Sequence, residues 1–255
     1  MSGLRLYLSS LFSRKVILVF VFLLPLLAIF LPELTPVSLK PSLIEPARAQ
    51  AAWVLLWLTT VIWILVEASS TGSRWQRGGI FELLLPASRN RFPKAMLALQ
   101  INAGLVFPSI VLLIETILIS LYLCTPSDSA EARLWSVTNL QYGTLYLIVT
   151  APLCLLAFSL GTRLNPVVSW IIVAAFLIYG LVIQEKFAPF LSGGGIASSL
   201  GSLCLPHYHL ADLTDRLVFK LGPLPPGVFG QFILYFGGWG IILGVVALTL
   251  FRPGR

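Results

Sequence analysis

The stretch Val16–Leu34, VILVFVFLLPLLAIFLPEL, carries a single charged side chain, Glu33, near its end. A helix needs roughly 20 mostly apolar residues to cross the hydrocarbon core of a bilayer. The rest of the chain has the same character, since 57% of its 255 residues are hydrophobic and only 11% are charged. Soluble domains carry about a quarter charged residues. The stretch therefore predicts the first membrane-spanning helix of an integral membrane protein.

Further apolar segments of similar length follow along the chain. They cover residues 51–66, 95–124, 140–161, 167–184 and 232–251. None shows the two-residue alternation of a membrane β-strand, so helices are the spanning structure that the sequence supports. The prediction is an all-α membrane protein, with six transmembrane helices in a single domain over residues 1–255.

The distribution of charge predicts the orientation. If the N-terminus lies inside, 11 of the 17 Lys and Arg residues fall on the inner side and seven of the ten Asp and Glu residues fall outside. Inner loops are enriched in Lys and Arg. We therefore expect a multi-pass protein of the bacterial cytoplasmic (inner) membrane with both termini cytoplasmic. The net charge of +7 follows from these loops and does not indicate nucleic acid binding.

The residues before the first span predict a helix that lies on the membrane. One helical face would carry Leu4, Leu8, Leu11 and Phe12, with Arg5 beside it. Such an amphipathic helix suits the cytoplasmic interface, where it would contact lipid. The alternative is a cytosolic extension of the first span.

The outer segment 191–230 is too apolar for a simple connecting loop. Its run Ile196–Leu205 is half the length of a span, which indicates a re-entrant or interfacial helix. A second helix is expected after Pro206, with Asp212 and Arg216 paired at i,i+4. Its apolar face would consist of Leu210, Leu213, Leu217 and Leu221. Two short helices are thus expected before the last span.

The segment 71–94, TGSRWQRGGIFELLLPASRNRFPK, lies in an inner loop. Gly78-Gly79 separates a basic half from the apolar half Ile80–Leu85. Five apolar residues in six positions exceed what a solvated loop should expose, so something must cover them. The bilayer interface and a groove in a partner protein are both consistent with this pattern. In the second case Arg74, Arg77 and Arg89 would set the orientation.

These residues resemble a known family. Arg77-Gly78-Gly79, then Glu82-Leu83-Leu84-Leu85-Pro86-Ala87-Ser88-Arg89, and Lys94 at the foot of a long span look like the coupling segment of type-2 ABC exporter permeases. Gly79 stands where Thr is common. The resemblance implies a second permease subunit, identical or homologous, and a separate ATPase dimer that binds ATP and Mg²⁺. The exported substrate would be hydrophobic, amphipathic or lipid-linked.

On this resemblance, residues 71–94 contain a coupling helix that docks to the ATPase. The docking residues it implies are Arg74, Trp75, Arg77, Gly78, Gly79, Phe81, Glu82, Leu83, Leu84 and Arg89. The chain itself contains no Gly-x-x-x-x-Gly-Lys-Ser/Thr loop and no His-Glu-x-x-His pair. We therefore expect neither enzymatic activity nor a directly bound cofactor or metal.

Three other features of the sequence suggest further hypotheses. Glu115 is a carboxylate inside a predicted span, which suggests a role in the substrate path or in gating. His207 and His209 are candidate metal or haem ligands and favour a haem-exporter-like subunit of cytochrome c maturation as an alternative. A further alternative is a membrane anchor that transports nothing. Cys124 and Cys204 lie on the same predicted side, so a disulfide between them is topologically allowed.

Overall fold

The computed structural model describes residues 4–5, 7–9, 16–34, 41–85, 91–125, 129–183 and 206–252. All regular elements in these residues are helices, which confirms the predicted all-α class. Helical runs long and apolar enough to cross a membrane are Val16–Leu34, Ile44–Arg77, Phe92–Tyr122, Ser129–Gly161 and Pro226–Leu250. A shorter apolar run covers Pro166–Val182. These helices fit a multi-pass membrane protein.

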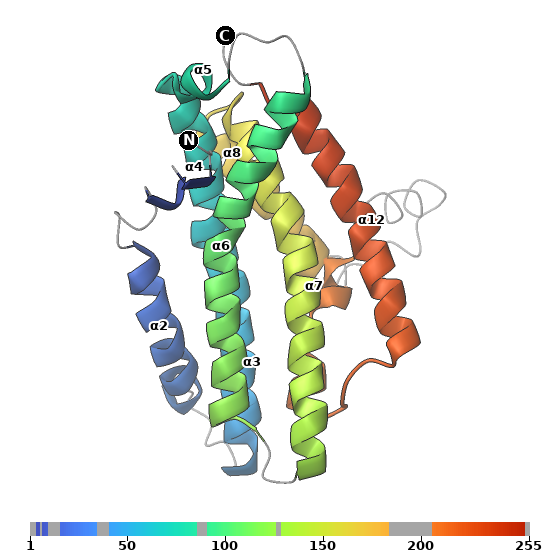
Figure 1. The fold of residues 1–255 in the computed structure, drawn as a ribbon. Helices are drawn as coiled ribbons and strands as arrows, with labels where there is room; N and C mark the ends of the chain where they lie inside the picture. Colours follow the sequence, from blue (N-terminus) through green and yellow to red (C-terminus); the bar gives the residue numbers. More distant parts are fainter. Residues whose placement is uncertain are drawn as a thin grey trace.

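The long helices form a bundle around α7 (Ser129–Gly161), as Figure 1 shows. Helix α7 contacts α4 (Leu65–Arg77), α6 (Arg91–Leu123), α8 (Pro166–Ile178) and α12 (Pro226–Leu250). On the other flank, α2 (Val16–Phe30) packs against α3 (Pro41–Thr59) and α6. Helices α2 and α12 leave most of their apolar surface uncovered. That arrangement suits helices whose outer faces contact lipid tails.

Helices α3 and α4 form one continuous rod joined by a π-helical turn at Thr60–Ile64. In this turn the Leu65 N–H bonds to the Thr60 carbonyl, which leaves the Val61 carbonyl free of its usual helical donor. The indole Nε1–H of Trp170 on α8 donates to that carbonyl at 2.7 Å. This bond attaches α8 to the irregular turn, and the rod runs from Pro41 to Arg77, beyond both ends of the predicted span 51–66.

The N-terminal segment lies against the bundle. Its described residues are helical, and Tyr7 is only 2% exposed. A Cβ on Gly104 of α6 would stand 2.7 Å from the Tyr7 ring and 3.4 Å from Leu4. Leu8 also packs against the core. Tyr7, which the prediction did not include in the apolar face, thus packs against α6 at Gly104; Leu11 and Phe12 lie outside the described residues.

Helix α8 begins at a clear sequence signal. The Asn165 side chain accepts the Val167 N–H at 2.9 Å, and Pro166 occupies the first helical position. The helix continues as a π turn at Tyr179–Ile183, close to the end of the predicted span 167–184. The apolar run Pro166–Val182 is shorter than the helices that are long enough to cross a membrane.

The described part of the outer segment differs from the prediction. It contains a 3₁₀ turn at Tyr208–Ala211 and α11 (Thr214–Val218), rather than one amphipathic helix. The expected Asp212–Arg216 pair is wrong, because the Asp212 carboxylate accepts the Thr214 N–H at 3.0 Å and so separates the two elements. Leu213 and Leu217 are buried, whereas Leu210 and Leu221 are exposed. The predicted re-entrant run 196–205 lies outside the described residues.

Candidate functional site

The predicted docking segment is divided between three elements. Residues 71–77 are the end of α4, the five residues Ile80–Leu84 form α5, and Arg91 begins α6. Helix α5 lies at one end of the bundle, where α4 and α12 also end (Figure 1). We call this the α5 end. Arg89 lies outside the described residues.

The glycine pair makes the turn between α4 and α5. The Gly78 N–H bonds to the Arg74 carbonyl at 2.9 Å and closes α4. Gly79 has φ +65°, in the left-handed region that side chains other than glycine enter at a cost. Its carbonyl then accepts the Glu82 N–H at 3.1 Å and starts α5. Glycine at position 79 thus makes this turn without the strain that a Cβ would add.

Helix α5 is fixed to the bundle by an aromatic cluster of Trp75, Phe81, Phe158 and Phe251. Phe81 is 1% exposed, and its ring centroid lies 5.4 Å from that of Phe251 on the chain just after α12 and 6.2 Å from that of Phe158 on α7. The Trp75 ring is 6.0 Å from Phe81. Edge-to-face rings at such distances stabilise one another beyond their burial. Trp75 and Phe81 thus support α5 from inside and offer no surface to a partner.

The opposite side of this region is open. Leu83 is 86% exposed, and Arg77, Gly78 and Glu82 are exposed around it. Neither Arg77 nor Glu82 forms an ion pair with another described residue. Leu84 is half-buried and packs against the core. We refer to Arg77, Gly78, Glu82 and Leu83 as the exposed face of α5.

Arg74 has a different role from Arg77. Its Nη2 pairs with the Glu67 carboxylate at 2.6 Å, two turns earlier in α4, and donates to Thr71 Oγ1 at 3.1 Å, one turn earlier. Its Nε donates to the Ser70 carbonyl. These contacts hold Arg74 along its own helix. The free charges beside Leu83 are therefore those of Arg77 and Glu82.

A close crossing of α4 and α7 lies next to the α5 end. A Cβ on Gly72 would stand 2.2 Å from the Phe158 carbonyl oxygen, and a Cβ on Gly161 would stand 2.1 Å from the Ser69 carbonyl oxygen. Small residues at helix crossings in membranes let backbones approach and pack by van der Waals contact. The crossing therefore packs the end of α4, which leads into α5, closely against α7.

The other candidate residues lie apart from the α5 end. Glu115 on α6 is half-buried, and its Oε2 has no hydrogen-bond partner among the described residues. The structure thus brings the docking residues together but leaves Glu115 separate. No group of three or more His, Cys, Asp or Glu side chains in the described part of the chain is arranged to hold a metal. Cys124 is buried and unbridged, and Cys204 is outside the described residues.

The histidines lie near α12 in the outer segment. His207 Nδ1 is 3.0 Å from the Tyr235 hydroxyl, and the two imidazole centroids are 5.7 Å apart. Burial, with a smaller contribution from the charge of His209, lowers the pKa of His207 below its ordinary value. The described residues supply no third ligand beside the pair.

Sequence reasoning missed a set of buried polar contacts between α3 and α7. Trp53 Nε1 donates to Asn139 Oδ1 at 3.1 Å, and Trp57 Nε1 donates to the Tyr142 hydroxyl at 3.0 Å. The Tyr142 hydroxyl also bonds to Asp212 and, at 3.0 Å, to Thr214 of the outer segment. The helical spacing of the two tryptophans was the available signal. These contacts attach the outer segment to the centre of the bundle.

Replacing Tyr142 by phenylalanine is expected to destabilise the protein by about 1 to 3 kcal/mol, because the Trp57 N–H would stay buried without its acceptor. Thermal unfolding of the purified protein in detergent measures the change. Tyr122→Phe, at an exposed tyrosine on α6, is the matched control and should leave the melting temperature unchanged. Equal shifts in the two variants would contradict the role given to the Tyr142 hydroxyl.

No protein-family model, curated protein or solved structure matches this chain.

Proposed function

We propose that the chain is the permease subunit of an ATP-driven ABC exporter. In this proposal a separate ATPase dimer binds ATP and Mg²⁺, and its groove receives the exposed face of α5. The permease works with a second copy or a homologous subunit and exports a hydrophobic, amphipathic or lipid-linked substrate. The segment Pro166–Ile183 completes a set of six spans.

The observation that carries the proposal is the two-sided environment of α5. One side is anchored by Phe81, and the other presents Leu83 with the charges of Arg77 and Glu82. A helix exposed in this way suits an amphipathic helix-in-groove interface. Because Phe81 contacts Phe158 and Phe251, a displacement of α5 would move α7 and the end of α12 together. Rigid elements of this kind transmit conformational change between sites.

The proposed orientation places the α5 end in the cytoplasm. The end of α12 and the described N-terminal residues lie toward this end of the bundle (Figure 1), which agrees with both termini being cytoplasmic. Arg163 also lies here, where its Nη2 donates to the Thr249 carbonyl at 2.9 Å near the end of α12. A basic residue at this level fits the inner side of a bacterial cytoplasmic membrane.

The proposal is tested by purifying the tagged full chain from the membranes of its own host. We expect a co-purifying chain with a Gly-x-x-x-x-Gly-Lys-Ser/Thr loop, identified by mass spectrometry, and Mg²⁺-dependent ATP hydrolysis in the complex. Leu83→Asp should lower recovery of that chain at least tenfold. The control Leu221→Asp, at a 62% exposed leucine in the outer segment, should not. Absence of such an ATPase, or equal losses in both variants, would contradict the proposal.

A further inference from the structure

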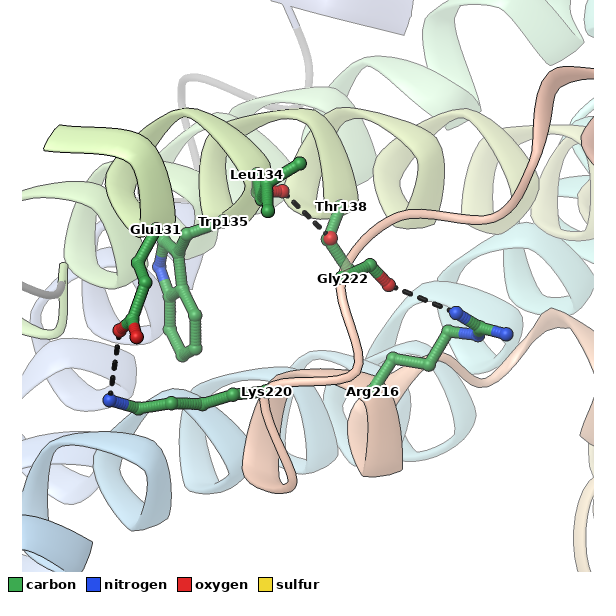
Figure 2. A pocket seen from close by; sticks show the side chains of 7 residues that line it. All are labelled: Glu131, Leu134, Trp135, Thr138, Arg216, Lys220 and Gly222. Atoms are coloured by element: carbon green, nitrogen blue, oxygen red, sulfur yellow. Dashed lines mark hydrogen bonds and ion pairs between the residues drawn. The ribbon is translucent and has the colours of Figure 1, made fainter. Parts of the chain in front are cut away.

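A small pocket opens at the end of the bundle where α7 begins. It has a volume of about 60 Å³ and lies between the first turns of α7, α11 and the loop that leads to α12. Figure 2 shows Glu131 and Trp135 on α7 facing Lys220, with Arg216 at the other side of Gly222. The volume admits several waters or one small polar group, and is far below that of a drug-sized site.

The two cations of the pocket are only partly engaged. Arg216 uses one guanidinium nitrogen, Nη1, which donates to the Gly222 carbonyl at 3.0 Å and to the Pro223 carbonyl at 3.5 Å. Its other nitrogens make no hydrogen bond with a described residue. Lys220 Nζ pairs with Glu131 Oε2 at 3.2 Å, and both side chains are half exposed. An exposed pair of this kind is weak and is readily exchanged for another partner.

The rest of the pocket is preformed. Trp135 is buried, and its indole Nε1–H donates to the Ser120 carbonyl of α6 at 3.0 Å, so its ring is a fixed wall. Lys220 has φ +52°, and among the described residues other than glycine it alone has a positive φ. Backbone strain of this kind is found at ligand sites more often than elsewhere. Here it directs a lysine across the pocket toward Glu131.

We propose that this pocket binds a phosphate group, carried either by a lipid headgroup or by free phosphate. Arg216, whose guanidinium points away from Lys220 past Gly222 (Figure 2), would turn toward the phosphate and present its unused nitrogens, which suit phosphate oxygens. Lys220 would leave Glu131 and pair with the phosphate. Glu131 then acts as a competitor, holding Lys220 while the pocket lacks an anion. The site goes beyond the proposed function and requires no partner ATPase.

The experiment uses the purified full chain in a nonionic detergent at low salt. Binding of dihexanoylphosphatidylglycerol and of inorganic phosphate is measured by microscale thermophoresis. Binding of the lipid alone identifies a headgroup site, and binding of both probes identifies a site for phosphate itself; either result supports the proposal. Dihexanoylglycerol, which lacks phosphate, is expected not to bind. Failure of both phosphate probes, or equal affinity for dihexanoylglycerol, overturns it.

Two charge variants of the pocket are expected to change phosphate affinity in opposite directions. Lys220→Gln should weaken binding at least fivefold, whereas Glu131→Gln should strengthen it about threefold by releasing Lys220. Arg133→Gln removes an exposed charge from the same turn of α7 outside the pocket and should change affinity less than twofold. If Arg133→Gln matched Lys220→Gln, the attraction would be a general surface effect. If Glu131→Gln weakened binding, the proposed competition would be wrong.

Discussion

Replacing Gly161 by alanine is expected to destabilise the protein by about 3 kcal/mol. The added Cβ would meet the Ser69 carbonyl oxygen at 2.1 Å, 2.9 Å from the carbonyl carbon and 3.1 Å from the Cα. These atoms belong to the backbone of α4, so no side chain can turn away to make room. The two helices must separate, which would also disturb the Gly72 contact with Phe158. Thermal unfolding in detergent and gel filtration measure the loss.

The matched control is Gly244→Ala on α12. No atom lies within 4 Å of a Cβ built at Gly244, so the same added methyl group meets open space. Alanine is a better helix former than glycine by roughly 0.5 to 1 kcal/mol, and this variant should be as stable as the parent or slightly more so. Similar melting temperatures for the two alanine variants would show that α4 and α7 do not cross as closely as the structure indicates.

If the chain is the proposed permease, replacing Phe81 by alanine is expected to reduce stimulation of the partner ATPase while leaving its binding intact. The residues of the exposed face of α5 are unchanged in this variant, but the contacts that join α5 to Phe158 and Phe251 are lost. In the co-purified complex, we expect partner recovery within twofold of the parent and a loss of at least tenfold in permease-dependent stimulation of ATP hydrolysis. A loss of this size corresponds to about 1.4 kcal/mol of coupling.

Two further variants make this result interpretable. Phe81→Leu retains much of the buried volume and should keep most of the stimulation. Phe92→Ala removes an exposed aromatic ring from the first turn of α6 and should change nothing. Normal stimulation in Phe81→Ala would contradict the coupling role of the aromatic cluster. If gel filtration shows that Phe81→Ala does not fold, stimulation is instead compared between Phe81→Leu and the parent.

The long helices of this chain could be predicted from its sequence because each contains a long run of apolar residues. Long apolar stretches predict spans wherever they occur, and Val16–Leu34 has the same bounds in the structure. The end of the rod formed by α3 and α4 was harder to predict. Residues 67–77 are polar on average, so hydropathy ended the span at 66, whereas α4 continues to Arg77 because it packs on α7 and α8.

Side-chain direction in the docking segment was not predictable from its pattern. Five apolar residues in six positions give no amphipathic period, and the resemblance to a coupling segment assigned both Phe81 and Leu83 as docking residues. The structure buries the first and exposes the second, because the Gly78-Gly79 turn sets the rotation of α5. The contact between Trp57 and Tyr142 was missed for a related reason. It joins residues 85 positions apart, and such pairings depend on how helices pack.

The proposed docking of α5 to an ATPase is tested most directly by a photo-crosslink from position 83. Leu83 is replaced by the photoreactive amino acid p-benzoylphenylalanine in the full chain, and membranes of the native host are irradiated. We expect a crosslink to a soluble ATPase chain with a phosphate-binding loop, which the same probe at Leu221 should not form. Crosslinks from position 83 to membrane lipid alone would show that α5 rests on the bilayer and would contradict the proposed coupling.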